Sequence, residues 1–131
     1  MIRDPEILEA LLDNISRFVR ERLVPNENLV AETDAIPQDL ASEMKALGLF
    51  GLCIPEEFGG LGLTMEEEVR VAFELGHTSP AFRSLFGTNN GIGSQGIIMD
   101  GTPEQKAFYL PKLASGEMIA AFALTEPGSG S

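Results

Sequence analysis

A regular recurrence of apolar residues between positions 4 and 23 is the feature that most constrains the fold of this chain. The recurrence has the spacing of one helix face and comprises Leu8, Leu11, Leu12, Ile15, Phe18 and Val19. Asp4 followed by Pro5 is typical of a helix start, because the Asp side chain can accept hydrogen bonds from free N–H groups and Pro already has a helical φ. The pattern predicts a helix over 4–23, which the polar residues 25–28, beginning with Pro25, would end.

A second helix is predicted to begin at Pro37 and to end at Gly48, because glycine is typical of the position just after a helix. Its buried side would carry Leu40, Met44 and Leu47. The stretch 49–63 contains a proline and several glycines, which predicts an ordered loop without a regular element.

A third helix is predicted to begin after Thr64, since Thr64 and Glu67 have the spacing of a capping box. It would run to about residue 77. Its inward stripe would consist of Met65, Val69, Ala72, Phe73 and Gly76.

The apolar, glycine-rich stretch 80–99 predicts one or two buried helices with a break near 87–90. Thr102, Pro103 and Gln105 combine an N-cap, a first-turn proline and a capping-box glutamine, so a last helix should run to about residue 115. Pro111 inside that helix should kink or split it.

The sequence changes character after Gly116. Residues 118–125 are apolar and bounded by turn residues, which favours a strand, yet a lone strand has no partner for its backbone groups. We therefore expect an N-terminal part of a longer protein. The expected fold class is all-α, an orthogonal or up-down bundle of about five to six helices with one short terminal strand.

The composition of the chain disfavours some classes of partner and some cellular compartments. Nine basic residues against 20 acidic ones give a formal charge of −11, which disfavours nucleic acid as a partner because phosphates would be repelled. A single cysteine, Cys53, can form neither an internal disulfide nor a zinc site alone, and it favours a reducing compartment. No apolar run is long enough to cross a membrane and no targeting signal is recognised at the start, so we expect a cytoplasmic protein.

Two glycine-containing motifs could carry chemistry. Residues 91–96 spell G-x-G-x-x-G, but no buried strand precedes them, so we interpret the glycines as sites of close helix packing rather than as a dinucleotide fingerprint. Residues 124–131, L-T-E-P-G-S-G-S, place hydroxyl and backbone N–H donors after the predicted strand, where they could hold a polar ring edge or a pyrophosphate. A flexible linker is the alternative interpretation of the last four residues.

The second motif resembles the flavin-binding signature of the acyl-CoA dehydrogenases, L-T-E-P-x-x-G-S-D, up to its last position. Three further stretches resemble the same family in the expected order, at 51–63, 101–106 and 109–117. The resemblance implies an N-terminal helical domain over 1–117 and the first strand and flavin-binding loop of a middle β domain over 118–131.

The resemblance also implies site residues and FAD as the cofactor. Phe122, Leu124 and Thr125 would lie along the flavin ring, with Thr125 hydrogen-bonded to its polar edge, while Gly130 and Ser131 would approach the pyrophosphate and the thioester side of the substrate. Leu85, Thr88 and Ile92 would line the acyl channel on one helix face, although an ordinary core role is the alternative for these three.

The implied reaction is α,β-dehydrogenation of an acyl-CoA thioester, with hydride transfer to FAD. The catalytic carboxylate would lie in a C-terminal bundle outside this chain, so no catalytic base and no metal ligand is assigned here. We expect this portion alone to be inactive, and the full-length protein to be a homodimer or homotetramer that passes electrons to an electron-transfer flavoprotein-like acceptor.

Two other functions remain as hypotheses. The chain could be a non-enzymatic helical interaction module whose acidic surface meets a basic partner. Alternatively, the same fold could serve an acyl-CoA oxidase or a nitroalkane oxidase, which resemble this family.

Overall fold

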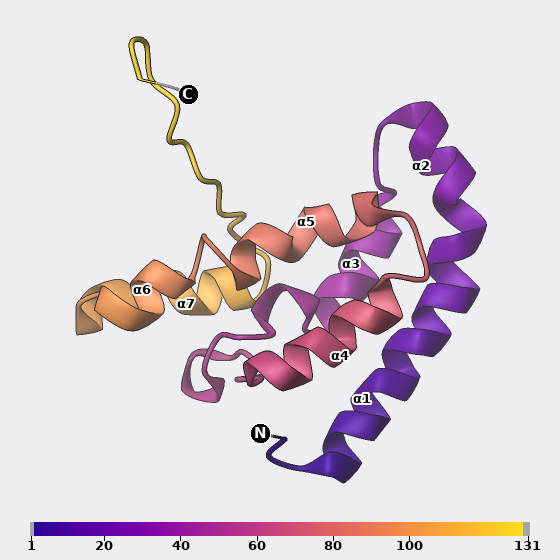
Figure 1. The fold of residues 1–131 in the computed structure, drawn as a ribbon, viewed down its shortest axis with the longest axis horizontal. Coiled ribbons are helices and arrows are strands. Elements are labelled where there is room, and N and C mark those ends of the chain that lie inside the picture. The colour runs from indigo at the N-terminus through magenta and orange to yellow at the C-terminus, as the bar shows by residue number, and fades with distance from the viewer. Residues whose placement is uncertain (1, 130–131) are drawn as a thin grey trace.

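The helix starts predicted from local capping residues are present in the computed structural model, which describes residues 2–129. Asp4 accepts hydrogen bonds from the N–H groups of Glu6 and Ile7, while Thr64 and Thr102 each form a complete capping box. Seven α-helical segments follow in the described residues: α1 Pro5–Phe18, α2 Glu27–Thr33, α3 Gln38–Ala46, α4 Met65–Leu75, α5 Pro80–Asn90, α6 Gln95–Asp100 and α7 Pro103–Ala114 (Figure 1). The predicted all-α bundle is confirmed.

The sequence predicts that the first helix ends before Pro25, but the helical path continues beyond this proline. A π-helical turn, Val19–Leu23, and a 3₁₀ turn, Val24–Asn26, lead from α1 into α2, so the helical path continues to Thr33. The wider turn accommodates the missing N–H of proline, and Asn26 Nδ2 donates to the Arg22 carbonyl oxygen at 2.7 Å. The path ends where Asp34 adopts a left-handed conformation with φ of 53°.

The main core lies among α1, the π-helical turn that follows it, α2, α3, α4, α5 and the loop after α3. Its fully buried members include Ile15, Leu23, Met44, Phe50 and Phe82. The predicted burial of Leu40 and Met44 is confirmed, and Leu47 is partly buried. Gly48 follows α3 with φ of +75°, which is the conformation expected of its role as a helix stop.

Helix α4 buries a different face from the predicted one. Val71 and Leu75 point into the core together with Glu67, whereas Met65 and Val69 are exposed and Phe73 is 71% exposed. Both sets of residues repeat at helical spacing, so the apolar pattern was ambiguous. Packing against α1 and the start of the chain selects the face that carries Val71.

The second half of the chain also differs from the expected boundaries. Helix α5 continues through 87–90 to Asn90, and the break falls at 91–94 instead. Pro111 does not split α7, which runs as one helix to Ala114. A second, smaller core joins α7 to the loop after α3 through Ile54, Leu110, Leu113 and Ala114.

The predicted strand at 118–125 is not formed in the structure described. These residues form an extended segment that leaves the bundle (Figure 1). No second strand lies beside it within residues 2–129, so its backbone has no ladder partner, and the only bridge in this part of the chain joins Glu126 to Ser129. Among the described residues, no helix combines the length and apolar character needed to cross a membrane.

Candidate functional site

A fully buried asparagine side chain holds the start of the extended segment. Asn89, near the end of α5, donates through Nδ2 to the carbonyl oxygens of Leu113 at 3.0 Å and Met118 at 2.9 Å. Its Oδ1 accepts from the N–H of Ala120 at 2.8 Å. One side chain therefore joins α5, the end of α7 and the first residues of the segment 118–129.

Gly93 allows the same segment to approach closely. A Cβ atom at Gly93 would lie 2.1 Å from Ala120 Cβ and 2.6 Å from the carbonyl oxygen of Thr88, so only glycine fits this position. The G-x-G-x-x-G pattern thus contains a close-packing glycine, but the side chain packed against it belongs to the extended segment and not, as the sequence had suggested, to another helix. At Gly96, by contrast, an added Cβ would meet no atom within 4 Å.

Beyond Ala120 the segment exposes apolar side chains and backbone groups that have no hydrogen-bond partner within the described residues. Phe122 is 62% exposed and Leu124 is 70% exposed, and the backbone of 121–125 makes no hydrogen bond within the described residues. Exposed apolar side chains therefore lie beside unpaired backbone N–H and C=O groups on this segment. Thr125 is also exposed, whereas Gly130 and Ser131 lie outside the described residues.

The three residues predicted for the acyl channel do not share one helix face. Leu85 and Thr88 lie on α5 and are half-buried, and Leu85 packs against the main core. Ile92 follows the end of α5 at Asn90 and is exposed. The helix ends too early for the i, i+3, i+7 spacing to place all three together.

A second buried asparagine holds the loop after α3. Asn90 Nδ2 donates to the Leu49 carbonyl oxygen at 2.6 Å and to that of Phe86 at 3.3 Å, while its Oδ1 accepts from the Cys53 N–H at 3.4 Å. The Cys53 thiol donates to the Asn90 carbonyl oxygen at 2.7 Å. Burial raises the pKa of this thiol, which disfavours the reactive thiolate and is consistent with a packing role.

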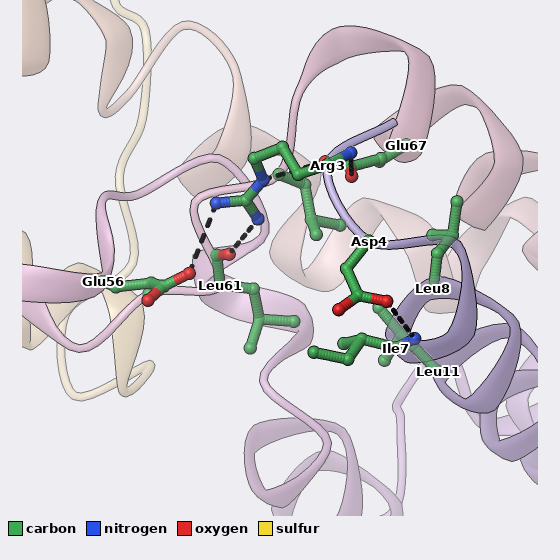
Figure 2. Close-up of a pocket in the computed structure, with 10 residues that line it drawn as sticks. Arg3, Asp4, Ile7, Leu8, Leu11, Glu56, Leu61 and Glu67 are labelled. Atoms are coloured by element: carbon green, nitrogen blue, oxygen red, sulfur yellow. Dashed lines mark hydrogen bonds and ion pairs between the residues drawn. The ribbon is translucent and has the colours of Figure 1, made fainter. Parts of the chain in front are cut away.

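A cavity of about 520 Å³ lies where the start of α1 meets the loop before α4 (Figure 2). Its apolar wall is formed by Ile7, Leu8, Leu11, Leu61 and Leu63. The charged side chains on its other wall pair with one another. Arg3 pairs with Glu56 at 3.3 Å and with Glu67 at 3.4 Å, and it also donates to the Leu61 carbonyl oxygen. None of the predicted site residues that the structure describes lines this cavity, and Figure 1 shows the start of α1 far from the outgoing segment 118–129.

Glu67 is the buried carboxylate of this wall. Its oxygens accept from the N–H groups of Arg3 at 2.9 Å and Thr64 at 2.7 Å, and these bonds, with the Arg3 charge, lower its pKa to about 2. A general base needs a pKa near the working pH, so Glu67 is suited to holding the chain start against α4 and not to proton transfer. No group of three or more potential metal ligands was found among the residues that the structure describes.

Asn89 and Gly93 were missed as site residues by sequence reasoning. The partners of Asn89 lie 24 to 31 positions away, so no local pattern connects them. The available signal was the presence of an uncharged polar residue inside a stretch predicted to be buried, because a buried amide needs hydrogen-bond partners.

Sequence comparisons give this chain a consistent set of relatives. A family described as acyl-CoA dehydrogenase, N-terminal domain, matches residues 5–117. The mitochondrial very long-chain specific acyl-CoA dehydrogenase of Macaca fascicularis is 42% identical over 126 residues, which cover 96% of this chain and 19% of the relative. A (2S)-methylsuccinyl-CoA dehydrogenase of Cereibacter sphaeroides is 41% identical and is covered to 23%. The chain thus spans about a fifth of the length of these curated relatives.

Solved structures have the same fold. An acyl-CoA dehydrogenase of Bacillus anthracis, complexed with FAD, superposes with a TM-score of 0.80 at 34% identity, over 98% of this chain and 22% of that one. A chain from a structure described as the electron transferring flavoprotein of Acidaminococcus fermentans superposes with a TM-score of 0.84 at 30% identity, over 99% of this chain and 34% of that one.

Proposed function

Because this chain belongs to the acyl-CoA dehydrogenase family, we propose that it supplies part of an FAD-dependent enzyme that dehydrogenates an acyl-CoA thioester. Residues 1–117 form its N-terminal helical domain and residues 118–131 begin its middle β domain. One observation carries the proposal: the bundle anchors an extended segment whose exposed Phe122 and Leu124 and unpaired backbone fit a flavin.

Each residue of the segment has a distinct role in the proposed cofactor site. Phe122 and Leu124 cover the flavin ring with apolar surface, and the Thr125 hydroxyl bonds to its polar edge. Gly130 and Ser131, outside the described residues, approach the pyrophosphate, and Ser131 also the thioester. When bound, the flavin supplies the acceptor for the hydride that leaves the β carbon of the acyl chain.

The substrate would lie along the other predicted residues. Leu85, Thr88 and Ile92 would contact the acyl chain, with Ile92 approaching from beyond the end of α5. Removal of the α proton needs a carboxylate as base, which we place, as the family resemblance implies, in a C-terminal bundle outside this chain. The pKa of Glu67, lowered to about 2, makes this buried carboxylate a poor base. This portion alone is therefore inactive, with most of the FAD contacts missing.

The partners follow from the same proposal. The reduced cofactor passes electrons to an acceptor similar to electron-transfer flavoprotein, and the full-length enzyme is a cytoplasmic homodimer or homotetramer. The structural similarity to a chain from a structure described as an electron transferring flavoprotein supports a flavin context for this fold.

The decisive experiment is anaerobic titration of the full-length, FAD-loaded protein with acyl-CoA thioesters of increasing chain length. We expect the flavin absorbance to bleach with at least one of them, and free CoA, which lacks the acyl group, to leave it unchanged. Absence of bleaching with every chain length would exclude the proposed reaction.

The same titration separates the related activities. Rapid recolouring in oxygen with formation of hydrogen peroxide would assign an acyl-CoA oxidase, and bleaching by nitroalkanes instead of thioesters would assign a nitroalkane oxidase. Both outcomes would overturn the dehydrogenase proposal while keeping the flavin fold.

A further inference from the structure

We propose that Asn89 is a positioning residue that sets the register of the flavin-facing segment, with Gly93 as its steric complement. This inference rests on the proposed function, because it assigns Asn89 to the placement of Phe122, Leu124 and Thr125. Asn89 itself would touch neither cofactor nor substrate; it would act through the backbone of residues 118–120.

The hydrogen bonds of Asn89 imitate those of a neighbouring β-strand. Its amide pairs with the carbonyl oxygen of Met118 and the N–H of Ala120, two groups that flank one residue and point to the same side of an extended chain. The second Nδ2 hydrogen is used by the Leu113 carbonyl oxygen, so the side chain is fixed at the end of α7. Both amide donors and the acceptor are thus occupied, and the side chain is fully buried.

This pairing excludes a shift of the segment by one residue. A slip would bring an N–H group opposite the Nδ2 donor and would also turn alternate side chains to the opposite side. Phe122 follows the anchored Ala120 by two positions, so its side in an extended chain depends on that register. Gly93 adds a steric limit, since any Cβ there would collide with Ala120.

The neighbouring Asn90 supplies a matched comparison. It is also buried and also uses both amide donors, but its partners, Leu49, Phe86 and Cys53, all lie within the helical domain. Replacement of either asparagine by aspartate removes the same chemical groups from the interior. Only the Asn89 replacement removes contacts to the segment 118–120.

The test uses the full-length, FAD-loaded protein with the variants Asn89→Asp and Asn90→Asp. We expect both to lower the thermal midpoint. Asn89→Asp should also raise the Kd for FAD at least tenfold, alter the flavin absorbance spectrum and speed hydrogen–deuterium exchange in peptides spanning 118–125. Asn90→Asp should leave the FAD Kd within threefold of the unmodified protein. Equal effects of the two variants on FAD Kd and on exchange would overturn the inference and leave Asn89 as an ordinary buried amide.

A second pair covers the case in which Asn89→Asp does not fold. Gly93→Ala should weaken FAD binding in the same way because its methyl group would displace Ala120, whereas Gly96→Ala has open space and should not. Indistinguishable FAD affinities for this pair would again contradict the inference.

Failure of the proposed function and failure of the inference about Asn89 would be seen in different measurements. If the unmodified protein does not bleach with any acyl-CoA, the dehydrogenase assignment fails. The exchange measurement still decides whether Asn89 holds the segment, because it requires no turnover.

Discussion

Glu67 is the only charged side chain that the fold buries among the described residues. It completes the capping box of α4 and also accepts the N–H of Arg3, so one carboxylate ties the start of the chain to a helix more than 60 positions later. Two backbone donors and a guanidinium stabilise its charged form. Ionisation of Glu67 should consequently contribute to the stability of the fold.

Replacement of Glu67 by glutamine should make this dependence measurable. Its pKa is lowered from 4.5 to about 2 in the folded chain, so its stabilising effect is complete above the unfolded value of 4.5 and disappears as the pH falls toward 2. We expect Glu67→Gln to lower the urea midpoint near neutral pH, and the gap to the unmodified protein to close on acidification.

The control for this measurement is Glu57→Gln. Glu57 is exposed and makes no hydrogen bond or ion pair within the described residues, so the same loss of charge there should leave the urea midpoint almost unchanged. A gap for Glu67→Gln that stays constant from neutral pH to about pH 2 would contradict the role assigned to its charge.

At the scale of elements, α4 has two apolar stripes and buries only one of them. Val71 and Leu75 contact the core, while Met65, Val69 and Phe73 lie on the exposed side. Burial of apolar side chains is the main source of stability, so the two stripes should differ strongly in their energetic importance.

Alanine replacements on α4 test which stripe is inside. Val71→Ala should lower the free energy of unfolding by about 2 kcal/mol, because it removes buried methyl groups and leaves a cavity. Phe73→Ala removes more atoms but from an exposed position, and should change the stability by no more than about 0.5 kcal/mol. Urea denaturation of both variants measures the difference, and the reverse order would restore the face first predicted from the sequence.

At the scale of the whole molecule, the bundle and the outgoing segment meet at few points. Asn89 makes the two side-chain hydrogen bonds to residues 118–120, Met118 N–H donates to the Lys112 carbonyl oxygen, and Gly93 leaves room for Ala120. Residues 121–129 extend away from the helices (Figure 1) and should add little to the stability of the bundle.

Two shortened chains test this division. A chain that ends after Glu117 leaves the buried Asn89 without two of its partners, and its free energy of unfolding should fall by about 1–3 kcal/mol. A chain that ends after Ala121 keeps both hydrogen bonds and should match the full 131-residue chain in urea denaturation. Equal stability of the two shortened chains would show that Asn89 does not need the segment.

The parts of the fold that could be predicted from the sequence are those set by neighbouring residues. Asp4, Thr64 and Thr102 mark helix starts correctly because each side chain bonds to N–H groups two or three positions away. Gly48 was recognised for the same reason, since its conformation ends the helix just before it. The helical class and the family resemblance follow from such local patterns along the chain.

The remaining features depend on contacts between distant segments. The buried face of α4, the passage of the helical path through Pro25 and the break after Asn90 depend on which surfaces pack together, and short-range spacing carries no information on that choice. The anchoring of the predicted flavin segment is the clearest case. Asn89 reaches partners up to 31 positions away, and a buried amide takes whichever partners the fold brings to it.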